Sequence, residues 1–158
     1  MTPPTLATVL EEIRRDLNTM PELRRCYFEV PDAVNERPAI VVVPSTGRWR
    51  FGPHSSDQGY TERFGIHRIA VVLLVPRQDL AKDFDLCVAF TDKVGDWLWA
   101  GFERDAYGGS TVMLGDPDLV NNATAPMEYT IGGSVWGSDQ DLALTYEFDV
   151  TILTETRV

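Results

Sequence analysis

The side chains best suited to acid–base chemistry in this sequence are its two histidines, His54 and His67. A nucleophilic site also needs a serine or cysteine partner and a group that orients the ring, and neither histidine has such neighbours along the chain. Asp116 and Asp118 form an Asp-x-Asp pair around a proline. Hard cations need more oxygen ligands than one such pair supplies, and aspartate and proline both favour turns. The sequence therefore predicts no catalytic site, no metal site and a protein that is not an enzyme.

Motifs for cofactors or redox chemistry are also absent from the sequence. The glycine pairs at 108–109 and 132–133 fit neither of the common phosphate-loop patterns, so we expect them to serve backbone geometry and predict no cofactor. Cys26 and Cys87 form no CxxC motif. This usage is typical of two buried free thiols rather than of a disulfide scaffold.

Residues 45–65 show no helix or strand periodicity, and the sequence predicts a loop of about 21 residues there. Loops of this length inside a compact domain are commonly functional or disordered, and disordered segments are poor in aromatic residues. This stretch instead contains the arginine and aromatic side chains that are enriched in protein interfaces. One interpretation is a subunit or tube contact, and the other is a loop folded back onto its own core. The candidate interface residues are Arg48, Trp49, Arg50, Phe51, Tyr60 and Arg63.

The sequence predicts a long strand at 141–154, where apolar residues alternate with polar ones. Such a strand needs neighbours at its edges and a layer across its apolar face. The short connection before it predicts an antiparallel hairpin with the preceding strand. We therefore predict an α+β fold with a single mixed, mainly antiparallel sheet and two main helices packed on one face. The expected helices are 2–18 and 79–101, and the expected strands are 24–30, 38–44, 66–77, 110–114, 127–136 and 141–154.

The second expected helix has apolar residues at spacings of three and four, which predicts one core-facing stripe. Its members are Leu80, Phe84, Cys87, Val88, Thr91, Val94, Leu98 and Phe102. Trp97 and Trp99 cannot both lie on that stripe, because neighbouring residues point to different sides of a helix. One of them is a candidate subunit contact, with a half-buried position on the helix shoulder as the alternative.

The length and the charge of the chain limit its domain number, its location and the partners that we expect. A chain of 158 residues predicts a single domain, 1–158. No apolar run approaches the length of a membrane span, and the start of the chain does not resemble a signal peptide, so we expect a soluble intracellular product and no membrane partner. Residues 1–78 carry ten basic and nine acidic side chains, whereas residues 79–158 carry four basic and fifteen acidic ones. An acidic half disfavours tight nucleic-acid binding but is compatible with DNA that passes without sticking.

The order of these elements resembles a known family. The residues that carry the resemblance are an N-terminal amphipathic helix, the strand RPAIVVVP, a long loop, the segment HRIAVVLLVPRQDL followed directly by a helix, and a final strand pair ending in YEFDVTIL. This arrangement resembles the tail terminator proteins of long-tailed bacteriophages, also called minor tail or tail-to-head joining proteins. The resemblance covers nearly the whole chain in element order, size and acidity.

The resemblance implies a structural subunit that assembles into a homo-oligomeric ring, a hexamer in this family, on the last ring of the tail tube. Its partners would be other copies of itself, the tail tube protein and a head completion or stopper protein. DNA would pass through an acidic channel without specific binding, and the ring would be assembled in the host cytoplasm and reside in the virion. Two alternatives stay open: another head-to-tail connector, such as a neck or stopper protein, and a cellular α+β ligand-binding domain or small enzyme.

Overall fold

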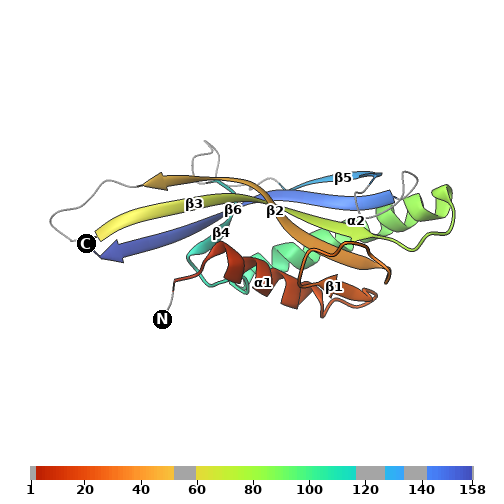
Figure 1. The fold of residues 1–158 in the computed structure, drawn as a ribbon, viewed down its shortest axis with the longest axis horizontal. Helices are drawn as coiled ribbons and strands as arrows, with labels where there is room; N and C mark the ends of the chain where they lie inside the picture. The colour runs from red at the N-terminus through yellow and green to blue at the C-terminus, as the bar shows by residue number, and fades with distance from the viewer. Residues whose placement is uncertain (1–2, 52–59, 117–126, 134–141, 158) are drawn as a thin grey trace.

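The computed structural model describes residues 3–51, 60–116, 127–133 and 142–157. The fold is α+β, with an elongated sheet and two helices beneath it (Figure 1). The element order is the one that the sequence predicts. The bounds are α1 Leu6–Leu17, β1 Arg25–Tyr27, β2 Ala39–Phe51, β3 Tyr60–Leu74, α2 Leu80–Glu103, β4 Val112–Leu114, β5 Met127–Gly133 and β6 Leu142–Arg157.

The sheet is mixed and mainly antiparallel, as predicted. Its strand order is β1-β2-β3-β6-β4. On the outer edge of β6, β4 pairs with residues 150–152 and β5 pairs with residues 142–148. Among the strands that the structure describes, only β1 and β2 run parallel. The predicted hairpin between β5 and β6 is confirmed, with Met127 opposite Phe148 and Gly133 opposite Leu142. The strand β6 is therefore central in the sheet, because β3 pairs with one of its edges and β4 and β5 pair with the other.

The helix α1 forms because its first turn is capped and one of its faces is apolar. The Thr5 hydroxyl accepts a hydrogen bond from the Thr8 backbone N–H, and the Thr8 hydroxyl accepts one from the Thr5 backbone N–H. This reciprocal arrangement satisfies two donors that a helix start otherwise leaves unpaired. The side chains that the helix buries against the sheet are Val9, Leu10, Ile13 and Leu17.

The helix α2 is capped by Asp79, whose carboxylate accepts from the Lys82 backbone N–H at 2.8 Å. Its buried positions are Asp83, Cys87, Phe90, Val94, Leu98 and Gly101. Both helices contribute to one core with the same face of the sheet, so their predicted placement on one face is confirmed. No helix within the described residues is long and apolar enough to cross a membrane.

The predicted core stripe of α2 is partly wrong. Leu80, Phe84 and Val88 are 69%, 50% and 52% exposed. The face that meets the sheet is rotated away from them and passes through Asp83, where the sequence pattern placed no core residue. Trp97 packs against the core and Trp99 is 51% exposed, so the two tryptophans divide as the spacing predicts.

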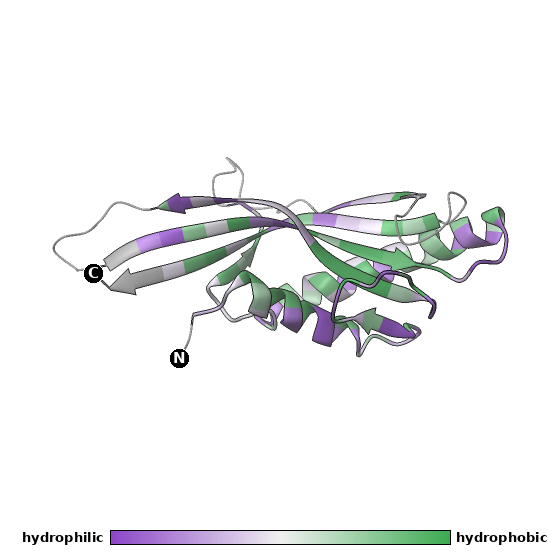
Figure 2. Ribbon diagram, in the orientation of Figure 1, coloured by the Kyte–Doolittle hydropathy of each residue, from purple (hydrophilic) through white to green (hydrophobic). Residues whose placement is uncertain are grey.

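The prediction of a 21-residue loop at 45–65 is also wrong. The strand β2 continues to Phe51 and β3 begins at Tyr60, so most of this stretch is paired sheet. Together with the end of β6 it forms a three-stranded projection beyond the helices (Figure 1), which we call the β-arm and define as residues 47–51, 60–67 and 150–157. Hydrophobic residues are concentrated where the strands lie over the helices, and hydrophilic residues recur along the arm (Figure 2).

A β-bulge separates the arm from the core part of β2. Pro44 pairs with Ile69 and Thr46 pairs with Arg68, which leaves Ser45 as an extra residue between them. An extra residue reverses which side chains point to which face. Before the bulge Ile40 and Val42 face the helices, and after it Gly47, Trp49 and Phe51 lie on that face.

Candidate functional site

The helix-side face of the β-arm carries an aromatic cluster around Trp49. The indole stands edge-on to the imidazole of His67, with 5.2 Å between ring centroids and an interplanar angle of 84°. The Arg63 guanidinium lies over the same indole, 4.7 Å from its centroid. Cation–π contacts of this kind fix an arginine at a surface while keeping its charge available. Trp49 remains 55% exposed, and Phe51 beside it on the same face is 66% exposed.

Glycines make room for this cluster. A Cβ atom at Gly65 would come within 2.6 Å of the Trp49 ring and 2.7 Å of His67 Nε2, and one at Gly47 would come within 2.9 Å of His67 Nδ1. All three distances are closer than a Cβ contact tolerates. The absence of a side chain at Gly65 therefore leaves room for the ring of Trp49, its partner on the neighbouring strand.

The opposite face of the arm holds the remaining arginines. Arg50 lies over the Phe64 ring at 4.7 Å, and Arg48 forms an ion pair with the buried carboxylate of Asp116. The segment after β4 is held there by Thr151, whose hydroxyl donates to the Gly115 carbonyl oxygen at 2.6 Å. Arg48 therefore has a role within its own subunit, whereas its neighbours on β2 present aromatic surface to solvent.

Farther along the same face, Arg68 is surrounded by three acidic side chains. Its guanidinium lies 3.3 Å from Glu147, 3.4 Å from Glu128 and 3.6 Å from Asp149. Hydrogen bonding to Glu147 and the three negative charges raise the pKa of Arg68, although desolvation opposes them. One cation among three anions leaves this part of the sheet face net negative.

The structure brings five of the six predicted interface residues onto the two faces of one arm. Arg48 and Arg50 share one face, and Trp49, Phe51 and Arg63 share the other. The backbone of Tyr60 pairs with Arg157 at the tip of the arm, and the Tyr60 side chain lies outside the described part. The sequence does not reveal Asp116 as the partner of Arg48, because no local pattern links a residue of β2 to the segment after β4, 68 residues further along the chain.

The outer edge of β2 is open along the arm. The strand β1 pairs with β2 only at 39–41, and Arg14 donates to the Val42 carbonyl oxygen at 2.5 Å. From Val43 to Phe51, no other described strand pairs with this edge. Unpaired backbone groups in a row form a template to which another chain can add a strand.

His67 is the only histidine among the described residues, and its environment does not favour proton transfer with a substrate. The side chain is 6% exposed, and burial lowers its pKa. Its Nε2 atom has no hydrogen-bond partner within the described residues. Packing between Trp49 and two glycine-containing strands makes this imidazole a structural element of the arm.

The predicted free thiols are confirmed. Cys26 and Cys87 are both buried and unbridged. Burial raises the pKa of Cys26 to about 12, although the Arg14 charge acts in the other direction. Burial and the neighbouring Asp83 raise the pKa of Cys87 to about 11. Neither thiol forms an appreciable thiolate at neutral pH, so both are chemically inert.

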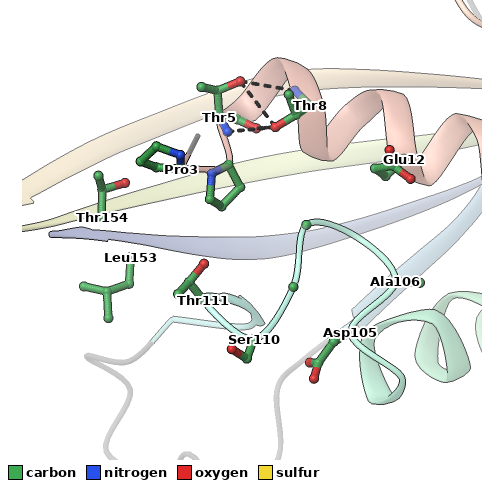
Figure 3. Close-up of a pocket in the computed structure, with 13 residues that line it drawn as sticks. Pro3, Thr5, Thr8, Glu12, Asp105, Ala106, Ser110, Thr111, Leu153 and Thr154 are labelled. Atoms are coloured by element: carbon green, nitrogen blue, oxygen red, sulfur yellow. Dashed lines mark hydrogen bonds between the residues drawn. The ribbon is translucent and has the colours of Figure 1, made fainter. Parts of the chain in front are cut away.

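An open pocket of about 860 Å³ lies where α1, β6 and the 105–111 segment meet (Figure 3). It is lined by hydroxyl groups such as Thr8 and Ser110 and by the carboxylates of Glu12 and Asp105. None of its described lining residues is a histidine, cysteine or lysine. The pocket therefore offers hydroxyl groups and carboxylates, but its described lining includes no histidine to activate a hydroxyl as a nucleophile.

The fold and its exposed arm define an α+β protein with an open strand edge. A scan against protein-family models and a search of the curated proteins found no match to the chain. Across the described ranges, no group of three or more histidine, cysteine or carboxylate side chains is placed to hold a metal ion. The best-defined candidate site is the exposed aromatic and arginine surface of the β-arm.

Proposed function

We propose that this protein is a tail terminator of a long-tailed bacteriophage, a structural subunit that forms a ring on the end of the tail tube. The ring would stop tube polymerisation and provide the surface to which the head is joined. The observation that carries the proposal is the β-arm, which combines the open β2 edge with exposed Trp49 and Phe51. A surface of this kind is suited to strand addition and to burial of aromatic anchors between subunits.

The electrostatic pattern supports the same proposal. Arginines are concentrated on the arm, whereas residues 79–158 carry fifteen acidic and four basic side chains. A cyclic ring joins two different patches of each subunit, and opposite charge between the patches would set the register of the contact. Acidic surface that remains unburied would keep the DNA in the channel from adhering.

Tail-tube capping provides the direct test of this function. We expect the purified protein to bind the ends of tail tubes and to block further addition of tube protein. The paired substitution Trp49→Ala with Arg50→Ala should abolish ring formation and tail joining. A matched control is Phe28→Ala with Arg24→Ala, which removes an exposed aromatic and an exposed arginine outside the arm. If the arm variant still forms rings and joins tails, the arm is not the contact.

The same assay separates the alternative connector function. A neck or stopper protein would bind filled heads rather than tail tubes. The pocket beside α1 is the observation that favours a ligand-binding function. That alternative predicts a protein that stays monomeric or dimeric at all concentrations and binds a small polar molecule in the pocket.

A further inference from the structure

The outer face of α2 carries an exposed apolar stripe that nothing described in this subunit covers. Leu80, Phe84, Val88 and Trp99 are each at least half exposed. Spacings of four, four and eleven residues keep side chains on one side of a helix. The stripe therefore extends over about 28 Å at 1.5 Å per residue. Exposed apolar side chains gathered on one helix face indicate a contact with another protein surface.

A row of carboxylates borders this stripe. Asp85, Asp92, Asp96 and Glu103 are all exposed, and spacings of seven, four and seven place them along one line of the helix. The two lysines of α2 have other partners, since Lys82 pairs with Asp79 and Lys93 pairs with Glu22. The outer face of α2 thus combines apolar surface with uncompensated negative charge.

The β-arm has the complementary composition. Trp49 and Phe51 are exposed aromatic anchors, and Arg63 is held over the indole by a cation–π contact. The five residues of β2 in the arm extend over about 17 Å, which is shorter than the α2 stripe. The arm could therefore lie along the helix with Trp49 and Phe51 on the stripe and Arg63, on the same face, near the acidic row.

We infer that the β-arm of one subunit docks on the outer face of α2 of a second copy of this chain. The arm and the first turns of α2 lie at opposite ends of the molecule (Figure 1), so the contact would join different patches of successive subunits. Repetition of such a contact gives a closed ring or an open filament. The inference specifies the subunit contact and rests on the proposed ring function for its biological role.

Charge reversal tests the pairing. We expect Arg63→Glu, on the face that carries Trp49 and Phe51, to weaken self-association roughly 10-fold, because like charges then face each other. Asp96→Arg should do the same from the helix side. Combining the two substitutions in one chain should restore association, since opposite charges meet again and the net charge equals that of the wild type.

The matched control combines Arg63→Glu with Glu29→Arg, an exposed acidic position outside α2. This chain has the same net charge as the restored variant but should stay dissociated. Equal recovery in both chains, or full association of the arm variant alone, would overturn the inference. Native mass spectrometry across a concentration series measures all of these outcomes, and circular dichroism verifies that each variant is folded.

A second measurement does not depend on ring formation. A photo-crosslinking phenylalanine analogue at position 51 should form a product between two copies that maps to α2, Leu80–Glu103. Such a product without rings or tube capping would uphold the contact and contradict the proposed function. Rings or tube capping with crosslinks to another element, including the pocket segment at 105–111, would uphold the function and overturn the contact. The absence of any product between copies would also overturn the contact.

Discussion

At the scale of single residues, Gly101 leaves room for the Tyr107 side chain, which links the end of α2 to α1. It lies in α2 directly above Tyr107, which is 1% exposed. The Tyr107 hydroxyl donates to the Asp16 carboxylate of α1 at 2.6 Å, and Arg104 pairs with the same carboxylate at 2.6 Å. Burial and the hydrogen bond to Asp16 raise the pKa of Tyr107 above its ordinary value. The tyrosine therefore stays neutral and connects α2 to α1.

Replacing Gly101 by alanine should destabilise the protein by about 1–3 kcal/mol, because the new methyl group would overlap the Tyr107 phenol. Gly95→Ala, also in α2, should stabilise by up to about 1 kcal/mol, because alanine favours helix and the nearest atom of Tyr146 is 3.6 Å away. Urea unfolding of both variants measures the two free energies. Changes of the same sign would contradict this account of Gly101.

His67 gives the protein a specific pH dependence. Its pKa is lowered from 6.5 in the folded state, so the unfolded chain binds this proton more readily. The free energy of unfolding should therefore be highest above about pH 6.5 and decrease as the pH falls below it. The variant His67→Gln should lose this dependence in urea unfolding at a series of pH values. A dependence that survives in His67→Gln but disappears in His54→Gln would contradict the assignment.

At the scale of elements, the sequence predicts those strands and helices that bury at least one face. The core parts of β2, β3 and β6 show the expected apolar patterns. The sequence predicts a loop where the arm lies because β2 is exposed on both faces from Pro44 onward, and only the four residues 48–51 alternate between charged and aromatic side chains. Its pairing partners on β3 and β6 hold it extended. The sequence predicts the wrong buried face for part of α2, because apolar residues cover more of the helix surface than the sheet can bury.

The start of α2 depends on Asp79, whose carboxylate caps the first turn. Asp79→Ala should lower the free energy of unfolding by about 1 kcal/mol, because a helix N–H loses its partner. Asp85→Ala removes an exposed carboxylate from the same end of the helix and should change stability by less than about 0.5 kcal/mol. Thermal unfolding can compare the two. An equal loss from both substitutions would point to general charge effects instead of capping.

At the scale of the whole molecule, size and element order predict the α+β class, whereas the sequence could not show that the candidate interface residues lie on one projecting arm. That placement depends on pairing between strands distant in sequence. The acidity of the second half of the chain was visible from composition. Its concentration along α2 and around Arg68 appears only in the folded chain.

Because its surface is acidic, we expect that the assembled protein does not bind DNA. We expect wild-type protein to retain no duplex DNA in a gel-shift assay at moderate ionic strength, because phosphate binding requires cationic surface. Glu128→Lys with Glu147→Lys would add two cations beside Arg68 and should produce salt-sensitive retention. Tight binding by the wild-type protein, or a basic lumen in an assembled ring, would contradict the prediction of an acidic channel.

The bulge at Ser45 changes which residue numbers along β2 lie on the helix-side face of the sheet. Even-numbered residues of β2 face the helices before it, and odd-numbered residues do so after it. Deleting Ser45 would leave a regular ladder in which Thr46 follows Pro44, so Trp49 and the arginines would keep the faces that they have now. The bulge thus holds one residue that the ladder does not need, so a deletion there would shorten the chain without altering either surface of the arm.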